Sequence, residues 1–198
     1  MPVSASSTGA SFTVPSTTDL KTHFRVTDTN SDDYIAALSS AVMTHLEAVT
    51  GRAIGSRKYT WTLDSFPCSW VLYVPKPPLQ SVTSITYIDT DGSTDTWGST
   101  YYTVDTASVP ARITPAYQET WPITRDVPNA VTIVFTAGYT SSGQVPTDLI
   151  HAGKFIAGHL WVNRQDVVAN PMGLSPVEMP RNSDWLLAKY QVPFFEGY

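Results

Sequence analysis

Two long segments with helical periodicity enclose a stretch of strand-like sequence, and this order limits the possible folds more than any other feature. Residues 31–50 repeat apolar side chains at three- and four-residue steps, which predicts an amphipathic helix that ends at Gly51. A second helix is predicted from Pro146 or Thr147 to about Arg164, and its apolar circumference indicates packing against the first. The side chains expected in this helical core are Ile35, Leu38, Val42, Leu46, Ile156 and Leu160.

Residues 56–138, between the two helices, have the sequence pattern of strands. Tyr59, Trp61 and Leu63 alternate with polar residues, and the pair Asp91-Gly92 supplies the positive φ values that a tight hairpin requires. We therefore expect an inserted β subdomain of about five to seven short strands, with an irregular loop at residues 115–128 folded over the sheet. Other strand candidates are 70–74, 81–89, 101–104, 111–114 and 131–136.

The ends of the chain have a different composition. Residues 1–16 are rich in Ser, Thr and Ala, which predicts a flexible arm without a core of its own that orders against a neighbour. A short helix is expected from Thr17 or Thr18 to Phe24. Residues 167–198 are expected to form a linker, a short helix at 182–191 and an aromatic tail.

The fold class expected from this order is α+β. A small antiparallel helical core, residues 17–55 and 139–166, holds two long helices and short terminal helices, and residues 56–138 form the inserted β-rich subdomain. A length of 198 residues suits one compact body with an inserted subdomain better than two independent domains.

The charge of the chain excludes several classes of protein. Charged residues make up 15% of the chain, below the roughly 25% of an average domain, and the net charge of −5 argues against a protein that grips DNA phosphates. A low charge is compatible with buried subunit contacts. The single cysteine, Cys68, excludes an intrachain disulfide. We find no membrane-length apolar run and no secretion leader, so we expect synthesis in the cytoplasm and no membrane.

No motif with a catalytic mechanism is found. Phosphate-binding glycine loops and the hydrolase elbow are missing, and His151 and His159 would lie roughly 12 Å apart on one helix, too far for a shared metal ion. Acidic residues at 89–95 suggest calcium, but Gly92 stands fourth in that motif instead of sixth, and a hairpin turn explains it better. We expect no catalytic residue, cofactor or metal; a hydrolase with dispersed acids stays open as a third alternative.

The chain holds six Trp and ten Tyr residues, which raises a carbohydrate-binding β module of a virion or cell-surface protein as the main alternative function. However, Trp61, Trp70 and Trp161 lie within regular apolar patterns that favour core packing. Aromatic residues near the C-terminus favour anchoring to a partner protein. The side chains predicted at an interface with a partner protein or a neighbouring subunit are Trp185, Leu186, Tyr190, Phe194, Phe195 and Tyr198.

Short sequence motifs spread over residues 17–166 carry a family resemblance. The most specific is Pro77-Pro78-Leu79-Gln80-Ser81-Val82. The other matching segments are 20–26, 32–35, 47–52, 83–85, 102–105, 110–113, 135–139, 145–146, 159–161 and 163–164. Together they resemble the phage head–tail connector (adaptor) proteins, in particular the longer branch with a β insertion found in siphovirus-like tailed phages and related gene transfer particles.

The resemblance implies a structural virion protein without catalytic residues. It implies a ring of about twelve copies below the portal protein, which extends the DNA channel and offers a docking surface to the tail or stopper protein. The expected location is the head–tail interface of the virion, after assembly in the bacterial cytoplasm. DNA would pass through the channel without sequence-specific binding, because a negatively charged channel repels it. The shortest family members are helical only, so the β subdomain would be an added outer or tail-facing module.

Overall fold

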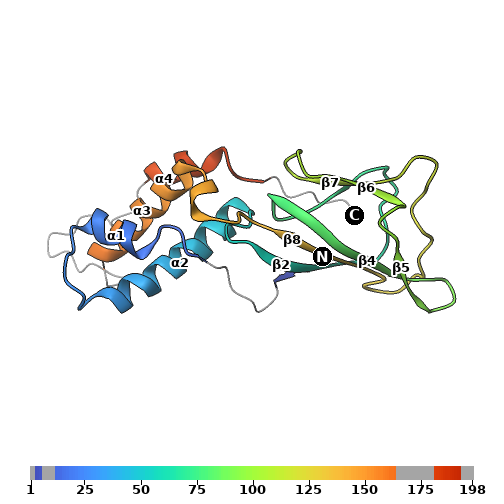
Figure 1. Cartoon of the computed structure of the whole chain (residues 1–198), viewed down its shortest axis with the longest axis horizontal. Helices are drawn as coiled ribbons and strands as arrows, with labels where there is room; N and C mark the ends of the chain where they lie inside the picture. The colour runs from blue at the N-terminus through green and yellow to red at the C-terminus, as the bar shows by residue number, and fades with distance from the viewer. Residues whose placement is uncertain (1–2, 6–11, 164–180, 193–198) are drawn as a thin grey trace, which may run out of the picture. The chain divides into compact units, whose positions relative to one another are not determined.

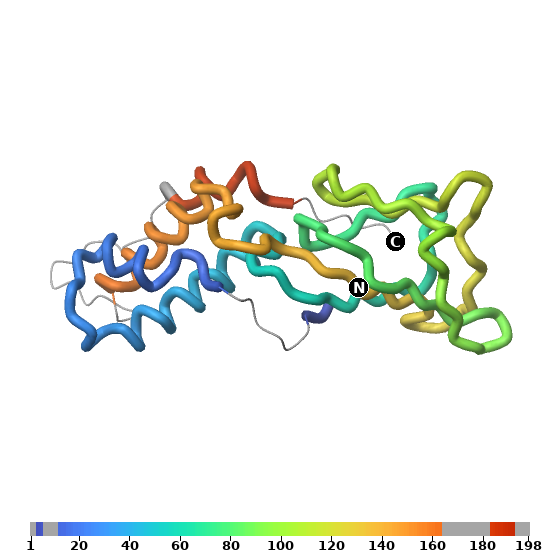
Figure 2. The backbone as a smooth tube through the Cα atoms, in the orientation of Figure 1, coloured from blue at the N-terminus to red at the C-terminus, as the bar shows by residue number. Residues whose placement is uncertain are grey.

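A computed structural model describes residues 3–5, 12–163 and 181–192 of the chain (Figures 1 and 2). These residues form two compact units. The helical unit combines residues 12–50 with residues 141–163 and 181–191. The β unit consists of residues 51–140, the strand at residues 3–5 and Val192. The α+β fold class expected from the sequence is confirmed, and the β unit is inserted between the two long helices.

The helical unit is built around the two long helices. Its elements are α1 (Thr17–Phe24), α2 (Asp32–Thr50), the 3-10 turn η1 (Ser142–Gln144), α3 (Thr147–Val162) and α4 (Arg181–Ala188). Helix α3 contacts each of the other three α-helices. The α2 side chains predicted in the core, Ile35, Leu38, Val42 and Leu46, are buried, as is Ile156 of α3. Leu160, one turn further along α3, is half-buried.

Local signals explain where the first two helices begin and end. Ser16 and Asp19 form a reciprocal capping box at the start of α1, and Arg25 ends this helix in the left-handed conformation at φ 58°. Lys21 then ties α1 to α2, because its Nζ donates hydrogen bonds to the Asp28 carbonyl at 2.7 Å and to Asp32 Oδ1 at 2.6 Å. Helix α2 ends before Gly51, whose φ of 70° suits glycine.

The β unit contains a five-stranded and a three-stranded antiparallel sheet. The larger sheet has the order β1-β2-β8-β4-β5 and the smaller one β3-β7-β6. The strands are β1 (Val3–Ala5), β2 (Arg57–Leu63), β3 (Leu72–Tyr73), β4 (Leu79–Ile88), β5 (Thr94–Trp97), β6 (Tyr102–Asp105), β7 (Arg112–Pro115) and β8 (Val131–Ala137).

Both sheets contribute to one hydrophobic core. Alternation along β2 and β8 turns every second side chain inward, and the register pairs Tyr59 with Phe135 and Trp61 with Ile133. Buried side chains of the smaller sheet, such as Ile113 of β7, belong to the same cluster. The β unit is therefore a two-layer structure around a single core.

The hairpin predicted at Asp91-Gly92 joins β4 to β5. Ile88 pairs with Thr94, the Gly92 N–H donates to the Asp89 carbonyl at 2.8 Å, and Gly92 has φ 90°. The acidic residues of this segment therefore belong to a turn, which is the interpretation the sequence favoured over a calcium loop. Among the residues that the structure describes, no group of three His, Cys, Asp or Glu side chains is placed to hold a metal ion.

Three features of the β unit differ from the sequence-based expectations. Residues 3–5, expected in a flexible arm, form the edge strand β1 on β2, because the exposed edge of β2 offers unpaired backbone groups. Strand β5 was not expected, since three of its four side chains are exposed and show no apolar alternation. Trp70, expected in the core, is 54% exposed, because the strand that follows it begins only at Leu72.

Candidate assembly interface on the helical unit

Helix α4 is anchored on α3 by a buried apolar side chain and by two polar contacts to Asp148. Leu187 of α4 is fully buried, while Lys189 forms an ion pair with Asp148 of α3. The Tyr190 hydroxyl also donates to Asp148 Oδ2 at 3.2 Å. The hydrogen bond from Lys189 lowers the pKa of Asp148, and the same contact raises the pKa of Lys189. The side chains of Lys189 and Asp148 are 61% and 36% exposed, so solvent weakens their attraction and burial of Leu187 provides most of the stabilisation.

The outer face of α4 forms an apolar groove with α3. The groove measures ≈ 400 Å³ and its lining includes Trp185 and Leu186 of α4 and Asp148, His151 and Phe155 of α3. Trp185 is 79% exposed and Phe155 is 40% exposed. Large aromatic side chains that are exposed beside a groove are typical of protein interfaces. We call this the α3–α4 groove.

The side chains predicted at an interface do not all lie on one exposed surface. Trp185 and Leu186 line the α3–α4 groove, whereas Tyr190 is half-buried and bonded to Asp148. Phe155 was not predicted at an interface, because the apolar circumference of α3 indicated burial of its side chains. The remaining predicted residues, Phe194, Phe195 and Tyr198, lie outside the described part of the chain.

A second aromatic surface lies at the C-terminal end of α3. Trp161 stacks on Phe24 of α1 with 4.8 Å between the ring centroids and lies 5.8 Å from the ring of Tyr34 of α2. Tyr34 is 40% exposed. We call Phe24, Tyr34 and Trp161 the Trp161 surface. The helical unit thus carries two different apolar surfaces.

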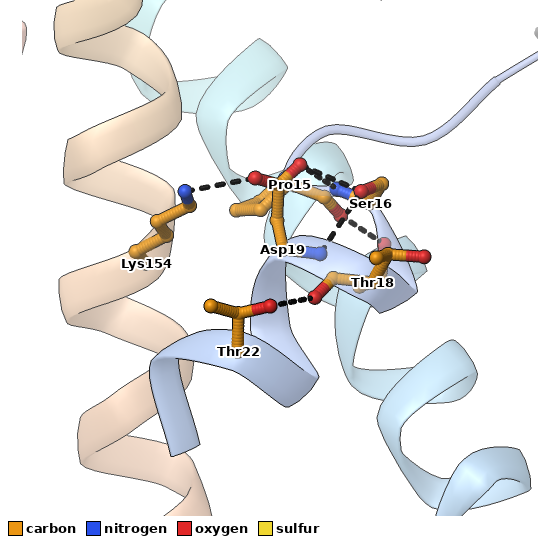
Figure 3. A network of polar contacts seen from close by, with 7 residues as sticks. Pro15, Ser16, Thr18, Asp19, Thr22 and Lys154 are labelled. Carbon is orange, nitrogen blue, oxygen red and sulfur yellow. Dashed lines mark hydrogen bonds and ion pairs between the residues drawn. The ribbon is translucent and has the colours of Figure 1, made fainter. Parts of the chain in front are cut away.

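A polar network fixes α1 against α3 (Figure 3). The Ser16 hydroxyl donates to Asp19 Oδ2 at 2.6 Å, and Lys154 Nζ donates to Asp19 Oδ1 at 2.9 Å. These two contacts, the one with Ser16 first, lower the pKa of Asp19. Their stabilising contribution is therefore present at neutral pH and is lost as the pH falls through the lowered pKa.

Gly153 allows α3 to approach the segment before α1. A methyl group at Gly153 would lie 2.7 Å from Pro15 Cδ and 3.2 Å from Leu46 Cδ1. The Ser39 hydroxyl holds this segment by donating to the Pro15 carbonyl at 2.5 Å, so the ring cannot move freely. Close packing at this point therefore requires glycine.

We expect Gly153→Ala to destabilise the protein although alanine favours helices. Overpacking against Pro15 costs about 1–3 kcal/mol, which exceeds the gain of about 1 kcal/mol in helix propensity. Gly158→Ala on the same helix is the matched control, because its methyl group would meet only the His23 ring, at 3.4 Å from Nε2 and 3.8 Å from Cδ2, and should leave stability unchanged or higher. Urea unfolding of both variants tests this, and equal midpoints would contradict the packing argument.

Chains of similar fold occur in solved structures of gene transfer agent particles. No family model and no curated protein matches the sequence. A chain in the neck of an empty gene transfer agent (GTA) particle, computed with C6 symmetry, matches with a TM-score of 0.76 at 20% identity, covering 100% of this chain and 99% of the other. The protein shares the fold of this neck chain.

Two further solved structures share this neck fold over the same extent. A chain of the virion of a native GTA particle matches with a TM-score of 0.75 at 22% identity. A chain in the neck of a native GTA particle, computed with C12 symmetry, matches with a TM-score of 0.68 at 24% identity. Each match covers 100% of this chain and 99% of the other, so both units belong to the neck fold. The resemblance to head–tail connectors in the sequence agrees with this fold.

None of the helices in the described part of the chain is both long and apolar enough to cross a bilayer.

Proposed function

We propose that the protein is a non-enzymatic structural component of a virion neck, the subunit of a head–tail connector ring. The observation that supports this proposal most strongly is the structural match to neck chains over nearly the whole length of both proteins. One of those necks was computed with C12 symmetry, which supports a ring of about twelve copies here. The family resemblance of residues 17–166 points in the same direction.

The two apolar surfaces of the helical unit suit a ring. In a cyclic ring each subunit uses two different surfaces, one for each neighbour. The α3–α4 groove and the Trp161 surface differ in shape and residues, so they are not copies of one self-complementary patch. We assign the Trp161 surface to the neighbouring subunit and the α3–α4 groove, with its exposed Trp185, to the portal protein.

The location and partners of the ring follow from the same proposal. The ring lies below the portal, extends the DNA channel and offers a docking surface to the tail or stopper protein. The chain has a net charge of −5, so a ring of these subunits is negatively charged and repels DNA, which favours sliding over binding. Salt screens this repulsion within about 8–10 Å.

Ring formation is the direct test. We expect the purified full-length protein to form rings of about twelve subunits in negative-stain micrographs and by mass photometry, alone or after addition of portal protein. Tyr34→Glu should prevent ring formation, because it places a charge on the Trp161 surface. Val109→Glu is the control, since Val109 is 58% exposed in the β unit. A protein that stays monomeric at every concentration and never binds portal would refute the proposal.

A further inference from the structure

Three connections of the β unit meet at one end of its sheets. Strands β2 and β4 end there, at Leu63 and Ile88, and β8 begins there, because it is antiparallel to both. Strand β3 leads away from this end and β7 returns to it. The segments 64–71, 89–93 and 116–130 therefore gather at this end, where Figure 1 shows the last of them crossing between the sheets. We call it the loop end.

The loop end exposes large apolar side chains, and the loops that carry them are held together by packed aromatic rings and a hydrogen bond. Tyr117 is 90% exposed, Ile123 is 77% exposed and Trp70 is 54% exposed. Beneath them Trp121 stacks on Phe66, with 5.1 Å between ring centroids, and its Nε1–H donates to the Ser69 carbonyl at 2.8 Å. This contact ties the 116–130 segment to the segment that carries Trp70. The exposed side chains are thus presented by ordered loops, which lowers the entropic cost of binding.

The loop end is also strongly acidic. Its three segments and the first two residues of β5 hold six carboxylates and a single basic side chain, Arg125. Arg125 lies over the hairpin turn, since its Nη1 would be 2.5 Å from a methyl group on Gly92. The carboxylates adjoin the aromatic base: Asp95 pairs with Tyr87, which contacts Phe66. The six acidic residues are Asp64, Asp89, Asp91, Asp95, Glu119 and Asp126.

The opposite end of the β unit has the opposite charge. Arg52, Arg57, Lys58 and Lys76 lie at the start of β2 and in the segments before β2 and β4. The chain also enters residues 51–140 and leaves them at that end, before β2 and after β8. Residues 51–140 contain nearly equal numbers of acidic and basic side chains, so their net charge is close to zero. The negative charge of the loop end therefore arises because acidic side chains gather at one end of the β unit and basic side chains at the other.

We propose that the loop end is a docking surface for a protein segment that carries Lys or Arg beside aromatic or aliphatic side chains. Apolar anchors supply contact area, and complementary charge supplies orientation and a fast encounter. The same carboxylates repel nucleic acid, so a DNA or RNA partner does not fit this surface. The chemistry of the partner is inferred from the loop end alone; only the biological reason for its docking rests on the proposed neck function.

Binding of short labelled peptides to the full-length protein tests the chemistry. The probe peptide alternates Lys with Trp; one control peptide has Glu in place of Lys and the other has Ser in place of Trp. We expect the Lys–Trp peptide to bind at least about tenfold more tightly than either control, with an affinity that falls as salt is raised. Equal binding of the Lys–Trp and Glu–Trp peptides, or no binding of the probe, would overturn the inference.

Two groups of variants locate the binding on the loop end. Asp89→Asn, Asp91→Asn and Asp95→Asn together should weaken binding and remove most of its salt dependence, because all three carboxylates lie on exposed positions or at the hairpin turn. Tyr117→Ser combined with Ile123→Ser should weaken binding at every salt concentration. The matched controls Asp33→Asn and Val109→Ser replace an exposed acid and an exposed apolar residue elsewhere, and should bind as the wild type does.

The outcome is separable from that of the proposed function. Loop-end variants that still form rings but lose the peptide support the inference, whereas unchanged peptide binding in both variant groups overturns it. A wild-type protein that binds the peptide but never forms rings or binds portal contradicts only the connector function. Binding of an oligosaccharide array that disappears in Trp70→Ala, without peptide binding, would replace the inference by carbohydrate recognition.

Discussion

Gly138→Ala is expected to destabilise the β unit by about 3 kcal/mol or more. Gly138 has φ +109°, a conformation that side chains rarely adopt, and a methyl group there would lie 2.4 Å from the carbonyl oxygen of Gly55. This oxygen cannot move away easily, because the flanking backbone is held by bonds from Ser56 N to the Tyr139 carbonyl and from Tyr139 N to the Ile54 carbonyl. The cost of the strained backbone at residue 138 and the cost of the overlap with Gly55 therefore add together.

Gly143→Ala is the matched control for this prediction. Gly143 has no atom within 4 Å of the position where a methyl group would stand, so its replacement should change stability by less than about 0.5 kcal/mol. Thermal and urea unfolding of the full-length variants, followed by near-UV circular dichroism, report on the aromatic core of the β unit. If Gly138→Ala unfolded at the wild-type midpoint, the prediction would be wrong, because the backbone at Gly55 would then move aside at little cost in free energy.

Trp185→Ala is expected to weaken binding to the portal protein by at least about 2 kcal/mol, which corresponds to roughly 30-fold in Kd. This prediction depends on the proposed connector function. Trp185 is 79% exposed and lies beside Phe155 in the α3–α4 groove, so a partner that covers it gains a large apolar area. Stability should not change, because Leu187 and not Trp185 fixes α4 in place.

Binding kinetics on immobilised portal protein, together with thermal unfolding, separate these two effects. Leu187→Ala removes the buried anchor and should lower both stability and portal binding. Trp185→Ala should lower binding alone, and Val109→Ala should alter neither, since Val109 lies in the β unit. Undiminished affinity of Trp185→Ala would exclude the α3–α4 groove as the portal contact.

Elements with a regular pattern could be predicted from the sequence. The three- and four-residue steps of α2 and the alternation in β2 and β8 reflect burial on one face, and burial is what these patterns encode. Strands β1 and β5 have no such pattern. Strand β1 forms because the edge of β2 is available, and β5 because the hairpin returns it to β4. Pairing of this kind depends on tertiary structure and is invisible along the chain.

The candidate interface shows a second limit of sequence reasoning. Trp185 was identified because it follows a long linker in an aromatic segment, where the chain offers little to pack against. Phe155 was interpreted as core because α3 is apolar around most of its circumference. An apolar side chain looks the same in a sequence whether its own chain or a partner covers it. Only the three-dimensional arrangement shows that α4 leaves Phe155 partly exposed.

The base of the β unit has a consequence for how such a chain can evolve. Gly55 and Tyr139 form a parallel bridge, so the incoming and outgoing segments of the insertion run side by side. Strands β2 to β8 therefore lie between two neighbouring points of the backbone, and only the edge strand β1 comes from outside this insertion. Residues 51–140 can be gained, lost or replaced at one point of the chain, so the docking specificity of the loop end can change independently of ring geometry.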